Sequence, residues 1–143
     1  MYEVYSDGTC IHSDVTPLTN CKLLSPKLVL QDNTAGTFTA ILPQQNIGCG
    51  HVHRLTSEIS ILRDGREIWS GRIIDEQVDF WNRRHLTCEG ELGYLNDTTQ
   101  PPAEYHDYTV RQFLEVLIAE HNRKVTAEKR FTVGVVTVHD TND

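Results

Sequence analysis

Polar and apolar positions alternate along much of the first two thirds of the chain, which predicts a series of short β-strands. Thr37–Leu42 has the β-branched and aromatic content of a strand and is ended by Pro43. Before it, Cys21–Gln31 alternates loosely and is broken at Ser25-Pro26, which favours an edge strand or a bulge. Asp32–Gly36 supplies turn residues between them. Strand character is also found at Gln77–Trp81 and His85–Gly90, whereas Gln44–Thr56 fits either a loop or a short helical turn.

The clearest local pattern is a β-hairpin. Ser57–Arg63 and Arg66–Ile73 flank Asp64-Gly65, a dipeptide that readily forms a two-residue type I′ turn. A longer loop with a shifted register is the alternative. Gly71, inside the second strand, indicates a bulge or a sharp bend of the kind that barrels need.

The two-residue turn sets which side chains share a face of this hairpin. It places Ile61 opposite Ile68, with Ile59 on the same face. The other face then carries the three residues Leu62, Trp69 and Ile73. A hairpin that is apolar on both faces is expected to be buried twice, once in its own core and once against something else.

One amphipathic helix is predicted over residues 109–123. Thr109 and Gln112 form a capping box, in which each side chain satisfies a free amide of the first turn. Apolar side chains recur every three or four residues and form a single stripe: Val110, Phe113, Leu114, Leu117 and Ile118. The segment from His121 to Lys124 is a suitable cationic end.

These elements divide the chain into two parts. We expect a β-barrel-like domain over residues 1–98, a linker over 99–108 that contains Pro101 and Pro102, and the start of a second domain over 109–143. The second part would hold the helix and one strand over 131–138. A helix and one strand cannot bury both of their faces alone. Either they pack back on the barrel, or the chain is the front part of a longer protein, which we favour.

Composition narrows the class of function. The 143 residues are 38% hydrophobic and 23% charged, enough apolar content for a folded core. The formal net charge of −7 argues against nucleic acid as the main partner, and the nearest basic patch, Arg83-Arg84 with His85, follows several acidic residues.

No apolar run is long enough to cross a bilayer, and Met1–Thr9 lacks the apolar stretch of a secretory signal. We therefore expect a soluble protein made in a cytoplasm.

The chemistry-bearing residues give no catalytic or cofactor signature. Cys49, His51 and His53 would point to one side of an extended strand, as zinc ligands do, and Cys10 with His12 repeats the spacing. Gly48 and Gly50 make a regular strand there unfavourable, so surface histidines beside a thiol are the ordinary interpretation. Nucleophile elbows, phosphate loops and dinucleotide fingerprints are absent. We expect no catalytic residue, no bound metal, no cofactor and reduced, structural cysteines.

The order of features resembles the N-terminal hub region of the prophage endopeptidase-tail, or tail-associated lysin, family of phage tail proteins. Five consecutive segments carry the resemblance: SPKLVLQDNTAGTFTAILPQQN, ISILRDGREIWSGRI, DFWNRRHLTCEGELGYLNDTTQPP, TVRQFLEVLIAEHNRKV and FTVGVVTVHD. It extends from about Leu24 to the end of the chain.

This resemblance implies a tail-tube-like β-barrel followed by a second α+β domain. Three copies would form a ring that caps the tail tube at the virion tail tip, docks on the distal tail protein, and passes the tape-measure protein and then DNA. Any peptidase or glycan-cleaving domain would lie beyond Asp143, so no enzyme activity is expected here. In that setting Trp69 would anchor the contact with a neighbouring copy, because aromatic residues dominate interface energetics.

Three alternatives stay open at this point. The chain could be a cell-wall hydrolase fragment, which would need a nucleophile or a metal centre. It could be a β-rich adhesion or glycan-binding module, which would present an exposed aromatic platform. Within the structural class, it could belong to a contractile injection machine such as the type VI spike hub.

Overall fold

Seven antiparallel strands form one curled sheet in the first of two units of the chain. The computed structural model describes residues 1–15 and 17–138, and it divides the chain into Met1–Gly93 and Tyr94–Asp143. The strands are β1 Tyr2–Ser6, β2 Thr9–Ser13, β3 Leu24–Val29, β4 Thr37–Leu42, β5 Glu58–Arg63, β6 Arg66–Val78 and β7 Arg84–Gly90.

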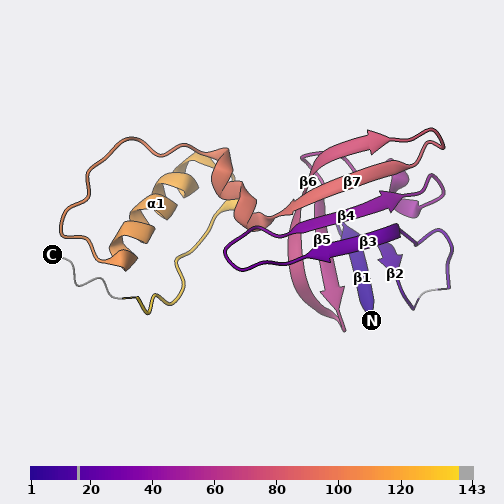
Figure 1. The fold of residues 1–143 in the computed structure, drawn as a ribbon, viewed down its shortest axis with the longest axis horizontal. Helices are drawn as coiled ribbons and strands as arrows, with labels where there is room; N and C mark the ends of the chain where they lie inside the picture. The colour runs from indigo at the N-terminus through magenta and orange to yellow at the C-terminus, as the bar shows by residue number, and fades with distance from the viewer. Residues whose placement is uncertain (16, 139–143) are drawn as a thin grey trace. The chain divides into compact units, whose positions relative to one another are not determined.

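The spatial order of the strands is β2-β1-β5-β6-β7-β4-β3, and the sheet curls into a half-barrel (Figure 1). The prediction of a mainly β fold with one helix is confirmed. The expected barrel is open, because the edge strands β2 and β3 are not paired with each other. A short 3₁₀ turn, η1 Ile47–Gly50, lies within the predicted loop between β4 and β5.

Two tight turns share the sequence Asp-Gly and lie at opposite ends of the β1–β5 pair. Asp64-Gly65 joins β5 to β6, with φ of 52° and 75°, and Arg63 pairs with Arg66, as a type I′ turn requires. Asp7-Gly8 joins β1 to β2 in the same way, with φ of 48° and 80°. The second hairpin was not predicted, although it carries the same dipeptide.

The predicted register of the β5–β6 hairpin is wrong by one residue beyond the turn. The register shifts at a bulge between Ile61 and Leu62, so that Ile61 pairs with Trp69 instead of the predicted Ile68. The side chain of Ile68 is 39% exposed. Because side chains alternate between the faces of a strand, a one-residue slip moves a side chain to the other face. Trp69 and Ile73 therefore lie in the core with Ile59 and Ile61, and the prediction that they face outward is wrong.

The core of this unit is one continuous cluster inside the curl. Its buried members are Val4, Ile11, Leu23, Phe38, Ala40, Leu42, Val52, Ile59, Ile61, Trp69, Ile73, Leu86 and Cys88. Trp69 packs on Phe38, and its indole N–H donates to the Ala35 carbonyl at 3.2 Å. A Cβ atom at Gly90 would lie 1.8 Å from the same carbonyl oxygen, so only glycine lets the two backbones approach here.

The second unit contains the helix α1 Val110–Lys124 and the short turn η3 Ala127–Lys129. The 3₁₀ turn η2 Glu91–Asp97 crosses the boundary, and its residues from Tyr94 onward belong to this unit. Helix α1 confirms the sequence prediction, including the reciprocal capping box of Thr109 and Gln112. The chain divides before Tyr94, so the Pro-containing stretch predicted as a linker belongs to this unit.

The strand predicted over residues 131–138 is not formed. Its backbone meets the helix instead of another strand. The Asn122 side chain donates to the Phe131 carbonyl at 2.7 Å and accepts from the Phe131 N–H at 2.9 Å, and Arg111 donates to the Gly134 carbonyl. High β-propensity does not make a strand without a neighbour to complete the ladder.

Candidate interaction surfaces

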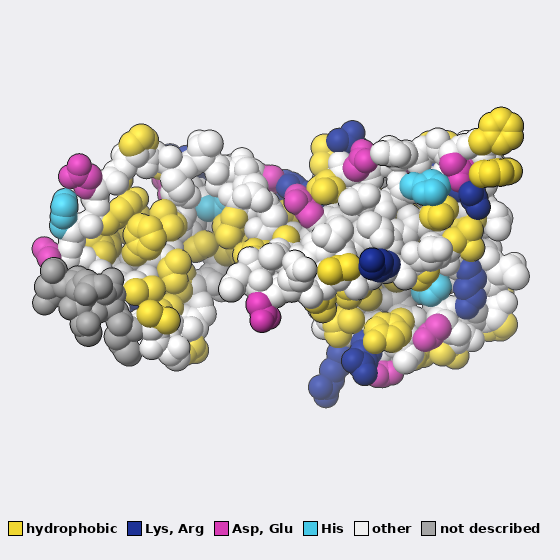
Figure 2. Space-filling view, viewed as in Figure 1, with side chains coloured by type: hydrophobic (Ala, Val, Ile, Leu, Met, Phe, Trp, Pro, Cys, Tyr) yellow, Lys and Arg dark blue, Asp and Glu magenta, His cyan; other side chains and the backbone are white. Residues whose placement is uncertain are grey.

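The most exposed aromatic residues of the sheet unit lie at the turn between β6 and β7. Phe80 is 95% exposed and Trp81 is 69% exposed, and their rings meet edge to face at 5.9 Å. Hydrophobic side chains project at this corner of the unit in the space-filling view (Figure 2). We call Phe80 and Trp81 the aromatic tip. The two adjacent rings form a small contiguous apolar patch, and such patches mark contact sites when they are exposed.

One carboxylate organises the turn beneath the aromatic tip. Asp79 accepts from the backbone N–H groups of Trp81 at 2.9 Å and Arg83 at 3.0 Å, and from the Arg83 guanidinium at 2.7 Å. His85 completes the set at 3.0 Å. Burial alone would raise the pKa of Asp79, but the hydrogen bonds from His85 and Arg83 hold it well below its usual range. The carboxylate therefore stays ionised at neutral pH and fixes the turn.

Arg83 also orders the indole of the tip. Its guanidinium carbon lies 4.9 Å from the centroid of the Trp81 ring, within cation–π range. Asn82, between them, adopts a positive φ of 58°, which closes the turn. The tip is thus pre-organised, which lowers the entropic cost of ordering its side chains when a partner binds.

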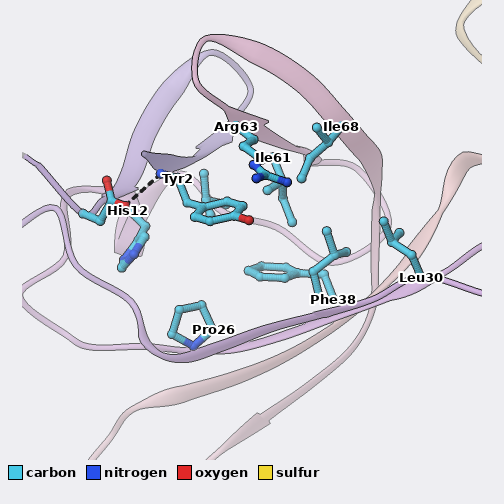
Figure 3. A pocket seen from close by; sticks show the side chains of 11 residues that line it. Tyr2, His12, Pro26, Leu30, Phe38, Ile61, Arg63 and Ile68 are labelled. Carbon is cyan, nitrogen blue, oxygen red and sulfur yellow. Dashed lines mark hydrogen bonds between the residues drawn. The ribbon is translucent and has the colours of Figure 1, made fainter.

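A second candidate surface is an apolar hollow of about 580 Å³ on the open side of the half-barrel. Its walls come from β1, β2, β5 and β6 on one side and from β3 and β4 on the other (Figure 3). The lining residues are Tyr2, Val4, His12, Asp14, Pro26, Leu28, Leu30, Phe38, Ile61, Arg63 and Ile68. Most of them are apolar, so the hollow suits a hydrophobic group.

Four polar side chains stand at the mouth of the hollow. The Arg63 guanidinium lies over the Tyr2 ring at 5.8 Å, and Asp14 accepts from the Tyr2 N–H at 2.9 Å. His12 accepts from the Leu23 N–H through Nδ1. Burial, followed by the Lys22 ammonium, lowers the pKa of His12, so its ring is neutral at pH 7.

The third candidate surface is the apolar stripe of α1. His121 is the one fully buried residue of the helix, whereas Phe113 is 38% exposed and Leu114, Leu117 and Ile118 are only half-buried. Among the described residues of this unit, only Tyr94 and His121 are fully buried. The stripe predicted from the sequence is present, but its own unit leaves much of it uncovered.

His121 is a structural residue. Its Nε2 donates to the Lys129 carbonyl at 3.0 Å, and its Nδ1 lies 2.8 Å from the Thr98 hydroxyl. The ring packs against Phe131 at 5.5 Å. His121 and its neighbour Asn122 therefore hold the chain that follows α1 against the end of the helix.

The three residues considered for a metal site do not converge. Cys49 lies in the 3₁₀ turn η1, where its carbonyl accepts from Arg84 at 2.8 Å. His51 and His53 follow at exposed positions outside any strand. The extended geometry that would align them is therefore not formed. Across residues 1–15 and 17–138, no group of three or more His, Cys, Asp or Glu side chains is placed to hold a metal ion.

The three residues predicted to form an interface, Leu62, Trp69 and Ile73, differ in how far they are buried. Trp69 and Ile73 are buried in the core, and only Leu62 lies half-buried on the outer face of β5. The aromatic tip was missed, because Phe80 and Trp81 were assigned to a strand. The adjacent turn residues Asp79 and Asn82 are the signal that could have placed both aromatic residues in a loop.

The comparisons with known proteins leave the family open. The sequence matches no protein-family model and no curated protein. Within the described part of the chain, no helix is both long enough and apolar enough to span a membrane.

Proposed function

We propose that this chain is a structural module of the hub at the tip of a phage-type tail. In this proposal three copies form a ring that caps the tail tube and attaches to the distal tail protein. The tape-measure protein and then DNA pass through the bore, and the net charge of −7 lets DNA pass without binding. The protein would reside at the virion tail tip, assembled in the host cytoplasm, and would carry no catalytic centre of its own.

The observation that carries the proposal is the rigid, exposed aromatic tip. Phe80 and Trp81 expose large aromatic side chains to solvent, on a turn that the hydrogen bonds of Asp79 fix. Aromatic anchors of this kind dominate the binding energy of protein interfaces. The half-covered stripe of α1 is a second apolar surface that a neighbouring chain would complete. The fold class, mainly β with one helix, is the one expected from the sequence, although the barrel is open.

The aromatic tip, rather than Trp69, takes the role of the interface anchor. Trp69 lies 7% exposed inside the sheet unit, so a partner could reach it only by unfolding the core. The tip needs no rearrangement to make contact.

The test is the mass of the full chain in solution, alone and with the distal tail protein encoded in the same gene cluster. Light scattering after size-exclusion chromatography should show a complex of three copies of each chain. Phe80→Ser with Trp81→Ser should weaken assembly at least tenfold while the melting temperature stays unchanged. Leu55→Ser is the matched control, because Leu55 is another exposed apolar side chain, at 55%, and lies outside the tip. A monomer that does not bind the distal tail protein would refute the proposal.

A glycan-binding module is the second candidate, because an exposed Trp is also a platform on which sugar rings stack. The Arg83 guanidinium already lies over the Trp81 ring, which leaves less free aromatic surface for a sugar. Titration of the tryptophan fluorescence, to which Trp69 and Trp81 both contribute, with cell-wall fragments separates the two candidates. Saturable binding by a monomer would favour the glycan module.

A further inference from the structure

The open side of the half-barrel is bridged by side-chain and isolated backbone hydrogen bonds rather than by a strand ladder. The Asn46 amide donates to the Ile11 carbonyl at 2.8 Å and to the Lys22 carbonyl at 2.9 Å. The Ser13 N–H donates to the Cys21 carbonyl at 3.4 Å. The segment just before β3 is thereby held alongside β2, although the two edge strands do not pair.

Two thiols meet at this seam. Cys10 lies on β2 and Cys21 in the segment before β3, and their sulfur atoms are 3.3 Å apart. The Cys21 thiol also donates to the Cys10 carbonyl at 3.2 Å. A disulfide needs the sulfur atoms at about 2 Å, so small side-chain rotations would suffice to form the bond. The backbone contacts of the seam already hold the two residues face to face.

We propose that Cys10 and Cys21 form a disulfide site that covalently closes the seam between β2 and the segment before β3. The oxidant class is a small-molecule disulfide such as oxidised glutathione. The inference concerns the sheet unit alone and is independent of the proposed function.

The reaction is a two-step thiol–disulfide exchange. The half-buried Cys10 loses its proton and attacks one sulfur of the oxidant, which releases one glutathione thiolate and leaves a mixed disulfide. Cys21, which is 6% exposed, then loses its proton and attacks the Cys10 sulfur, which releases the second glutathione. The two cysteines lose two protons and two electrons in total, and the oxidised glutathione gains both electrons.

The surroundings set the speed of the first step. Burial, and then the hydrogen bond with Cys21, raise the pKa of the Cys10 thiol above its ordinary value. Only a small fraction is thiolate at neutral pH, so the reaction should be slow there. Its rate should rise about tenfold for each pH unit below that raised pKa.

The other two cysteines are internal controls. Cys88 is fully buried in β7, where burial raises the pKa of its thiol to about 12, and Cys49 lies in the turn η1. Among the described residues, no hydrogen bond joins either thiol to Cys10 or Cys21, so neither should enter the linked product.

The experiment exposes the reduced full chain to oxidised glutathione and maps the peptides without reduction by mass spectrometry. We expect one product, a Cys10–Cys21 cross-link lacking two hydrogens. We also expect a melting temperature about 10 °C above that of the reduced protein, because the bond restricts the unfolded chain. Cys10→Ser should abolish both effects, and Cys49→Ser should leave both unchanged.

Three results would overturn the proposal. They are a lasting glutathione adduct on Cys10, a cross-link that includes Cys49 or Cys88, and a Cys10–Cys21 cross-link that lowers the melting temperature. Because the mapping is done on the unmodified sequence, a variant that fails to fold leaves the test intact.

Discussion

The two units of the chain differ in how much apolar surface they bury. The sheet unit encloses a continuous core in which Leu42, Ile73 and Cys88 are fully buried. The helix unit has the same kind of apolar residues, but those of α1 are at most half-buried, and the fully buried residue of the helix is the polar His121. Burial of apolar area is the main source of folding stability. The sheet unit is therefore equipped to be stable alone, whereas the helix unit depends on polar contacts until another surface covers its stripe.

The largest effect is expected at the centre of the sheet unit. Trp69→Ala should lower the free energy of unfolding by about 3–5 kcal/mol, because it leaves a cavity beside Phe38 and removes the donor to the Ala35 carbonyl. Urea denaturation followed by circular dichroism measures the loss. Ile68→Ala, next in the chain but 39% exposed, is the control and should cost about 0.5 kcal/mol or less. Equal losses in the two variants would contradict the bulged register.

The corresponding change in the helix unit replaces its buried polar residue. His121→Ala should cost about 1–3 kcal/mol of local stability, because the Lys129 carbonyl and the Thr98 hydroxyl lose their partner. Hydrogen exchange at residues 127–131 should quicken, while exchange in β5 and β6 stays unchanged. His106→Ala, at an exposed side chain, is the matched control. Faster exchange in the sheet would break the distinction between the units.

The cap of α1 should have a smaller effect. Thr109→Ala removes the acceptor of the Gln112 N–H and should cost about 1 kcal/mol of helix stability. Because little apolar packing supports the helix, that loss should lower the helix content and reduce the helical circular dichroism signal. If the signal does not change, the helix is held by tertiary packing, and the contrast between the units is weaker than described.

The same contrast explains what the sequence could and could not predict. The Asp64-Gly65 turn and the Thr109–Gln112 cap were predictable because both depend on residues within one turn of chain. The bulge that turns Trp69 inward was not, since it depends on how β6 packs against the rest of the sheet. The strand predicted over 131–138 failed because β-propensity needs a partner strand, and Asn122 offers the backbone other hydrogen bonds. The aromatic tip was missed because Phe80 and Trp81 were assigned to a strand, whereas β6 ends at Val78 and a turn begins at Asp79.

The smallest expected effect is the contribution of one carboxylate of the sheet unit, Glu76, to the pH dependence of stability. The hydrogen bond from Arg84, followed by its charge, keeps the pKa of Glu76 below its usual range despite partial burial. A carboxylate with a lowered folded-state pKa contributes stability above its unfolded pKa of about 4, and this stability is lost as the pH falls toward the folded value. Below about pH 4 the unchanged protein should therefore lose more stability than Glu76→Gln, by about 1 kcal/mol or less. Asp79 and the other carboxylates with a lowered pKa titrate in both proteins and cancel in the comparison. An equal loss in the two proteins below about pH 4 would contradict this assignment.

Hydrogen exchange on the isolated full chain, kept dilute enough to be monomeric, tests the central claim most directly. The amides of β5, β6 and β7 should be protected to the limit of global unfolding, while those of α1 should exchange at least a hundredfold faster. Adding the assembly partner should slow exchange in α1 and leave the sheet unchanged. Equal protection of α1 and the sheet in the monomer would contradict the account, because the helix would then need no further surface.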